Sequence, residues 1–217
     1  MIPTPDLSHL STKDYDLVYE PAEDTFLLLD GLEADLDALK AAEPRICLEI
    51  GSGSGCISAF LSKILGPSSA VYICTDINPH ANKATRGTGR QNQVELDPVN
   101  AVFALPLQQR LRGSVDVVLF NPPYVPTSFE EAQMSQNQGD IGGAWAGGWD
   151  GMAVTNKFLE QVEELLSPQG RFYLVALKQN NVPEIRQRME DRFKLHSEVV
   201  IERRAGREYL YIIRFTR

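Results

Sequence analysis

The fold is decided by one stretch, Arg45-Ile46-Cys47-Leu48-Glu49-Ile50-Gly51-Ser52-Gly53-Ser54-Gly55. Its first part is mostly apolar, as in a buried strand, and glycines then stand at every second position. Apolar residues at helical spacing predict that a helix comes next: Ile57, Phe60, Leu61, Ile64 and Leu65. Strand, glycine loop and helix in this order are typical of the ligand-binding opening of a doubly wound α/β sheet, where bare backbone and a helix N-terminus approach the ligand.

The glycine loop departs from the dinucleotide-binding pattern in two ways. Its spacing is G-x-G-x-G, and Cys56 stands where G-x-G-x-x-G would need the third glycine. Glu49 precedes the loop by two residues. A carboxylate there is a poor neighbour for a pyrophosphate and a good one for an ammonium group, so the loop favours a ligand with a cationic group.

The next apolar run, residues 70–75, predicts a second strand that ends at Asp76. An acidic residue at this place accepts hydrogen bonds from the hydroxyls of a ribose. The alternative is that Asp76-Ile77-Asn78-Pro79 only caps the following helix, with proline in its first turn. Both interpretations can hold if they use different atoms.

A further buried strand is predicted at 115–120, and it runs into Asn121-Pro122-Pro123-Tyr124. The two prolines lack N–H groups, so this corner offers hydrogen-bond acceptors on a rigid backbone beside an aromatic ring. Such a corner suits an –NH2 group held by its hydrogens. The alternative is a strand that ends in an ordinary proline turn.

The rest of the chain surrounds these motifs. Residues 1–17 predict a loosely attached N-terminal arm, and Tyr19 with the turn Glu23-Asp24-Thr25 either caps a helix or covers a ligand. An apolar stretch at 99–107 predicts the third strand and a turn. Residues 126–152 predict a long substrate-side loop. Two further strands around Ala205-Gly206 predict a closing hairpin.

Composition narrows the class of protein. A chain of 217 residues fits one domain with a short extension, and a net charge of -8 argues against a protein that grips the nucleic-acid backbone. Three widely spaced cysteines predict buried free thiols, and neither they nor the histidines have the spacing of a metal site. Because no signal peptide or long apolar run is present, we expect no membrane contact and a cytoplasmic protein, with the nucleus as a further location.

Taken in order, the loop with Glu49, Asp76 after strand two and the Asn121 corner after strand four resemble the class I S-adenosylmethionine-dependent methyltransferases. The segment 18–25 and the run Ala144-Trp145-Ala146-Gly147-Gly148 are similar to HemK-like protein-glutamine methyltransferases of the eukaryotic and archaeal release-factor branch. The resemblance implies a domain at 18–217 with a seven-stranded Rossmann-like sheet. It implies methyl transfer from S-adenosylmethionine to the glutamine of the Gly-Gly-Gln loop of a class I translation release factor.

The resemblance also implies a site. The cofactor would be held by Tyr19, Thr25, Glu49, Gly51, Gly53, Asp76, Ile77, Phe103 and Asn121. Transfer would be carried out by Asn121, Pro122 and Tyr124. The family usually has an acidic residue at the end of strand three, near the adenine amine, and the run Ala101-Val102-Phe103-Ala104 has none. Backbone atoms or Phe103 would take its place.

A small zinc-binding activator subunit is the partner that the resemblance implies, with the zinc on the partner. The stretch 99–107 would form an edge strand, and no charged residue lies between Asp97 and Arg110 to protect it. We therefore expect the activator to dock there, and Phe103→Asp to break the complex while sparing the Asn121 corner.

Three classes of function remain as alternatives. An adenine-N6 methyltransferase of nucleic acid uses the same corner but needs a basic channel. A protein or histone lysine methyltransferase is the second alternative. The third is a dinucleotide-binding oxidoreductase or a non-catalytic binding module. The glycine spacing argues against the oxidoreductase, and the intact Asn121 corner argues against the binding module.

Overall fold

The computed structural model describes residues 1–124, 151–206 and 208–217. The predicted loop at 126–152, with the run Ala144-Trp145-Ala146-Gly147-Gly148, lies outside the described residues except for its last two positions. In the part of the chain that is described, no helix is both long and apolar enough to cross a membrane.

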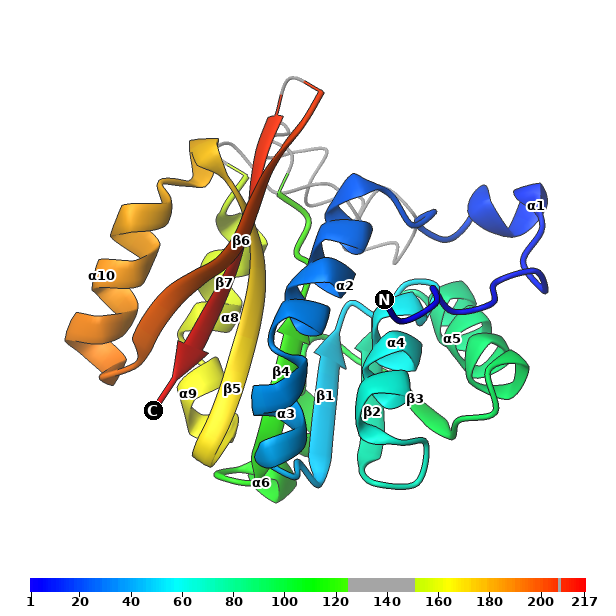
Figure 1. Cartoon of the computed structure of the whole chain (residues 1–217), viewed down its shortest axis with the longest axis horizontal. Helices are drawn as coiled ribbons and strands as arrows, with labels where there is room; N and C mark the ends of the chain where they lie inside the picture. The colour runs from blue at the N-terminus through cyan, green and yellow to red at the C-terminus, as the bar shows by residue number, and fades with distance from the viewer. Residues whose placement is uncertain (125–150, 207) are drawn as a thin grey trace.

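The described residues form a seven-stranded sheet in the order β3-β2-β1-β4-β5-β7-β6 (Figure 1). The strands are β1 (Ile46–Ile50), β2 (Val71–Asp76), β3 (Leu96–Asn100), β4 (Val115–Phe120), β5 (Leu166–Leu177), β6 (His196–Ala205) and β7 (Glu208–Thr216). Strands β1 to β5 are parallel, and β7 runs antiparallel to both of its neighbours. The predicted doubly wound sheet with a closing antiparallel hairpin is confirmed.

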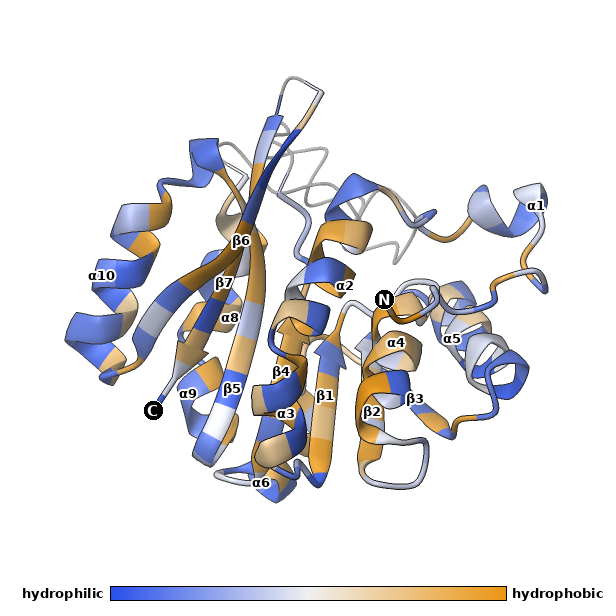
Figure 2. Ribbon diagram, in the orientation of Figure 1, coloured by the Kyte–Doolittle hydropathy of each residue, from blue (hydrophilic) through white to orange (hydrophobic). Residues whose placement is uncertain are grey.

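Helices cover both faces of the sheet. They are α1 (Thr12–Tyr15), α2 (Glu23–Ala34), α3 (Leu36–Ala41), α4 (Cys56–Leu65), α5 (Pro79–Gln91), α6 (Gln108–Leu111), α8 (Ala153–Leu159), α9 (Val162–Leu165) and α10 (Val182–Phe193). Helices α2, α3 and α4 bury their leucines in one core, and α8, α9 and α10 contribute to a second core. The strands β1 and β4 between these layers are largely hydrophobic (Figure 2).

The winding of the sheet determines where a ligand can bind. From β1 the chain proceeds outward through β2 to β3, and from β4 it proceeds the other way to β5. The neighbouring strands β1 and β4 therefore begin the two halves of the sheet, and a crevice opens beyond their carboxyl ends. The glycine loop follows β1 and the Asn121 corner follows β4, so the fold brings both motifs to this crevice.

The stretch 99–107, predicted as the third strand and a turn, is strand only as far as Asn100, so the edge strand expected through 107 is wrong beyond that residue. Strand β3 lies at the edge of the sheet, as expected, but it begins at Leu96 and ends at Asn100. Phe103 then adopts a left-handed backbone conformation with φ 49°, and a 3-10 turn, η1, occupies Leu105–Leu107. The apolar residues after β3 therefore fold back over the end of the sheet and do not extend its edge.

The N-terminal segment is more firmly attached than the sequence predicted. The backbone N–H of Asp6 donates to Oδ1 of Asn92 at 2.8 Å, after helix α5, and the N–H of Ile2 donates to Glu33 on α2 at 2.7 Å. The polar composition of this segment predicted a loose arm. The prediction failed because hydrogen bonds to distant helices leave no pattern in the sequence.

Candidate active site

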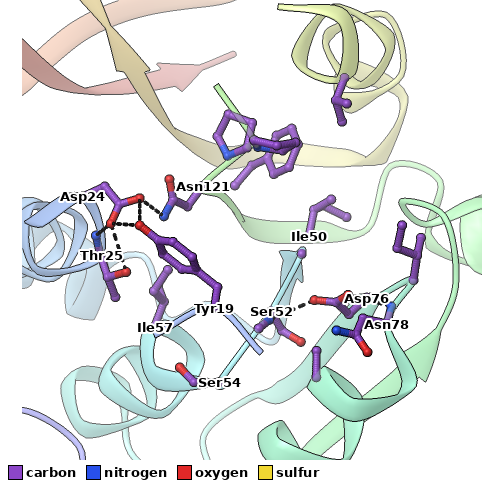
Figure 3. A pocket seen from close by; sticks show the side chains of 18 of the residues that line it. Tyr19, Asp24, Thr25, Ile50, Ser52, Ser54, Ile57, Asp76, Asn78 and Asn121 are labelled. Carbon is purple, nitrogen blue, oxygen red and sulfur yellow. Dashed lines mark hydrogen bonds between the residues drawn. The ribbon is translucent and has the colours of Figure 1, made fainter. Parts of the chain in front are cut away.

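A cavity of ≈ 500 Å³ lies at the carboxyl ends of β1, β2 and β4, within the range of small-molecule sites. All of the predicted site residues except Glu49 line it: Tyr19, Thr25, Gly51, Gly53, Asp76, Ile77, Phe103, Asn121, Pro122 and Tyr124. Figure 3 shows labelled side chains of the cavity from four places: α2 and the segment before it, the glycine loop, the end of β2 and the corner after β4. The tertiary fold thus gathers motifs that are far apart in the sequence.

The glycine loop presents open backbone to this cavity. Gly51 and Gly53 have φ of 67° and 53°, in the left-handed region that favours glycine. A Cβ atom at either position would meet no atom within 4 Å, so the space beside them is free for a ligand. Gly55 differs, because a Cβ there would lie 2.8 Å from the Cα of Thr85 on helix α5. The first two glycines suit ligand binding and the third permits close helix packing.

Asp76 fastens the loop to the end of β2. Its Oδ2 accepts from the N–H of Gly53 at 2.9 Å, and its Oδ1 accepts from the N–H of Asn78 at 2.8 Å. Burial raises the pKa of this carboxyl, although the two backbone donors act in the opposite direction. The helix cap is made by Asn78, whose side chain accepts from the N–H of His80. Capping and ligand binding can therefore use different atoms, and Asp76 retains a face toward the cavity.

Glu49 is the predicted cofactor residue that the structure does not bring to the cavity. Its side chain is 1% exposed and points toward α4, where Oε2 accepts from the N–H of Ser58 at 3.0 Å and from its hydroxyl. Successive side chains of a strand point to opposite faces, so Glu49 faces the helix layer. Burial raises the pKa of Glu49 to about 8, which leaves it mostly neutral at physiological pH. Glu49 does not line the cavity, but its Oε1 has no hydrogen-bond partner among the described residues, so its role as the partner of an ammonium group stays a prediction.

The corner after β4 is tied to Asp24, which the sequence analysis named only as part of a turn that caps a helix or covers a ligand. Asp24 accepts hydrogen bonds from Nδ2 of Asn121 at 2.9 Å and from the hydroxyl of Tyr124 at 2.7 Å. The hydroxyl of Tyr19 donates to both oxygens of the same carboxylate at 3.1 Å. The only sequence signal was an acidic residue in the first turn of a helix, and such residues usually serve as caps.

Two consequences follow for the chemistry of the corner. Burial and the nearby Asp24 carboxylate raise the pKa of Tyr19 and Tyr124, so both phenols remain protonated hydrogen-bond donors. Oδ1 of Asn121 is buried and has no hydrogen-bond partner in the described residues. An unpaired acceptor in a cavity wall fits a ligand that donates hydrogens.

One wall of the cavity is apolar. The ring of Phe103 packs against Phe120 and Phe158, with ring centroids 6.3 and 5.3 Å apart. Ile77 and Val154 also line the cavity, as do two charged residues that the sequence interpretation did not single out, Lys157 and Glu208. Among the described residues, no group of histidine, cysteine and acidic side chains could hold a metal ion. The cavity therefore combines an apolar slot with a polar, acceptor-rich corner.

Comparison with known proteins agrees with this arrangement. A family described as "Methyltransferase small domain" matches residues 25–137. The chain is 47% identical to mouse (Mus musculus) "Methyltransferase HEMK2", over 100% of this chain and 97% of that protein. It is 42% identical to the fission yeast (Schizosaccharomyces pombe) "eRF1 methyltransferase catalytic subunit mtq2", over 100% of this chain and 96% of that protein. The solved E. cuniculi Mtq2-Trm112 complex, described as responsible for methylation of the termination factor eRF1, matches with a TM-score of 0.67, 28% identity and coverage of 92% and 98% of the two chains.

Proposed function

The chain belongs to the methyltransferase small-domain family and, within it, to the HEMK2 methyltransferases, and on this premise we propose that it methylates the side-chain amide nitrogen of a protein glutamine. The substrate we propose is the glutamine of the Gly-Gly-Gln loop in a class I translation release factor. The names of the fission yeast and E. cuniculi relatives, which refer to eRF1, support this choice. The observation that carries the proposal is the buried Oδ1 of Asn121 in the cavity wall beside Pro122, which has no hydrogen-bond partner among the described residues.

The methyl donor that fits this cavity is S-adenosylmethionine. When bound, it supplies an electrophilic methyl group on a positively charged sulfur. Gly51 and Gly53 offer open backbone, and Asp76 offers a carboxylate to the ribose hydroxyls. The apolar slot beside Phe103 suits a planar base, in place of the acidic residue that this chain lacks after β3. Glu49 is left out of this assignment, because it does not line the cavity.

The corner residues address the main chemical difficulty of the reaction. An amide nitrogen is a weak nucleophile, since its lone pair is delocalised into the carbonyl group. Oδ1 of Asn121 would accept one hydrogen of the substrate amide and the carbonyl of Pro122 would accept the other. These bonds hold the nitrogen in one orientation and favour the localised lone pair. Positioning of this kind can lower a barrier by several kcal/mol. Once the methyl group is attached, the nitrogen would release one proton to solvent water.

A labelled-methyl assay tests this function. Wild-type chain with its activator should label release factor, and a release factor with Gly-Gly-Ala in the loop should stay unlabelled. Asn121→Ala should abolish transfer, because it removes the acceptor, while calorimetry finds cofactor affinity largely retained. Histone and DNA complete the panel, because they represent the lysine and adenine alternatives. Label on these two alone, or near-normal turnover by Asn121→Ala, would contradict the proposal.

We further propose that a small activator subunit docks at the free edge of β3. The solved complex of the E. cuniculi relative with a second protein supports such a partner. Leu105, shortly after β3, is an exposed apolar residue that does not line the cavity, and among the described strands β3 pairs with β2 alone. Zinc would belong to the activator. The cavity opens at the strand ends, so a partner at the edge leaves it accessible.

A further inference from the structure

Asp24, the second residue of helix α2, is the centre of a buried hydrogen-bond cluster. It is 3% exposed, although aspartate side chains are almost never fully buried unless they are paired. Besides the three side chains already described, the backbone N–H of Thr25 donates to Oδ1 of Asp24 at 2.6 Å. Figure 3 shows Asp24, Tyr19 and Asn121 converging at one end of the cavity. A buried carboxylate with this many donors is held in one place, because each donor lost would leave it less well solvated.

This cluster decides which way the amide of Asn121 points. An ionised carboxylate only accepts hydrogen bonds, whereas the asparagine amide has a donor end and an acceptor end of nearly equal size. With Nδ2 placed 2.9 Å from Oδ2 of Asp24, one hydrogen lies between the two atoms. The reverse orientation would put two oxygens at that distance with no hydrogen between them. The carboxylate therefore leaves Oδ1, which has no hydrogen-bond partner in the part of the chain that the structure describes, as the end available to a ligand.

We propose that Asp24 is a positioning residue, which fixes the amide of Asn121 so that its oxygen meets the hydrogens of the substrate –NH2 group. The inference rests on the proposed function and adds a source of substrate selectivity to it. A glutamine side chain offers two hydrogens to that oxygen. A glutamate side chain has the same shape but offers only acceptors. Its carboxylate oxygen would face Oδ1 of Asn121 with no hydrogen between the two atoms. Sites built to hydrogen-bond a substrate group reject analogues that lack it far better than apolar pockets can.

An exchange of the two side chains tests the orientation directly. Asp24→Asn should lower kcat about 100-fold or more, because the asparagine pair can adopt either orientation. Asn121→Asp should do the same, because it sets two carboxylates against each other. The double variant should regain about tenfold over either single variant, because the new amide at position 24 can donate to the new carboxylate at position 121. That arrangement again leaves an acceptor facing the substrate. KM for S-adenosylmethionine should change little in the two single variants and in the double variant.

Asp30→Asn is the matched control, because Asp30 lies on the same helix and pairs with Arg203 outside the cavity. It should retain wild-type activity. A double variant no more active than the single variants, or an Asp24→Asn variant with wild-type kcat, would overturn the inference.

A second measurement does not depend on activity. In ¹⁵N-labelled protein the side-chain N–H signals of Asn121 should exchange slowly with water, and Asp24→Ala should remove this protection while Asp30→Asn keeps it. Equal exchange in all three proteins would overturn the inference. If the wild-type chain methylates no glutamine, the proposed function fails, and this comparison still decides the role of Asp24.

Discussion

At the scale of single residues, the carboxylate of Asp76 has two tasks. It holds the N–H of Gly53, and so shapes the glycine loop, and it offers its remaining acceptor capacity to the cavity. The sequence interpretation considered only the second task. Because both tasks use the carboxylate, its loss would affect the loop and the ligand together.

We expect Asp76→Ala to weaken S-adenosylmethionine binding by about tenfold or more, since an unpaired buried polar group costs about 1–3 kcal/mol. Asp76→Asn should lose less, because its amide oxygen can still accept from Gly53. Isothermal calorimetry on both variants checks this, with the exposed Asp37→Ala on α3 as the control. Unchanged affinity in Asp76→Ala would remove this residue from the site.

At the scale of elements, the segment after β3 corrects our expectation about the partner. Its apolar residues predicted an edge strand, and Phe103 was expected to face the activator. The structure instead turns the chain at Phe103 and packs its ring against Phe120 and Phe158, in the wall of the cavity. Phe103→Asp would place a charge in that wall, so it would damage the site itself. It cannot serve as a clean probe of the interface.

Leu105 is the better probe. It is 53% exposed in η1 and does not line the cavity. We expect Leu105→Asp to weaken the complex with the activator, because a charge at an apolar contact must lose water when the partner binds. Cofactor affinity measured in the same samples should stay near that of the wild type. Phe26→Asp is the control, since Phe26 is an exposed apolar residue on α2, away from β3. Size-exclusion chromatography measures complex formation by the two variants. Equal complex formation by Leu105→Asp and Phe26→Asp would argue against an interface at this edge.

At the scale of the whole molecule, Glu49 makes the stability of the fold depend on pH. Its pKa is raised from 4.5 to about 8 in the folded chain, chiefly by burial. Below the unfolded pKa both states hold the proton, and between the two pKa values only the folded state holds it. The folded state thus binds more protons in this window, so the contribution of Glu49 to the free energy of unfolding decreases as pH rises toward 8.

Glu49→Gln should remove this dependence, because glutamine keeps the shape of the neutral acid and does not ionise. Urea denaturation between about pH 5 and pH 8 should show wild-type stability falling relative to the variant as pH rises. Below that range the two proteins should be similar. If the difference in unfolding free energy between wild type and Glu49→Gln stayed constant from about pH 5 to pH 8, Glu49 would be ionised in the folded chain.

The local motifs of this protein were determined by its sequence. Strand, glycine loop and helix at residues 45–65 can be predicted because periodicity and glycine spacing are properties of neighbouring residues. The same holds for the corner at Asn121-Pro122-Pro123-Tyr124, whose lack of donors follows from proline chemistry. Their order along the chain predicted the doubly wound sheet and resembled the class I methyltransferases, and the strands around Ala205-Gly206 predicted the closing hairpin.

Only the tertiary structure decided how the side chains at these motifs are used. Asp24 and Asn121 are 97 positions apart, and no spacing rule connects them before the sheet brings α2 beside the end of β4. Glu49 precedes the glycine loop just as a ligand-binding carboxylate would, yet the strand turns its side chain toward α4. The physical reason is the same in both cases. A strand or helix is set by neighbours in the chain, whereas a buried polar group takes the direction in which the packed fold supplies its hydrogen-bond partners.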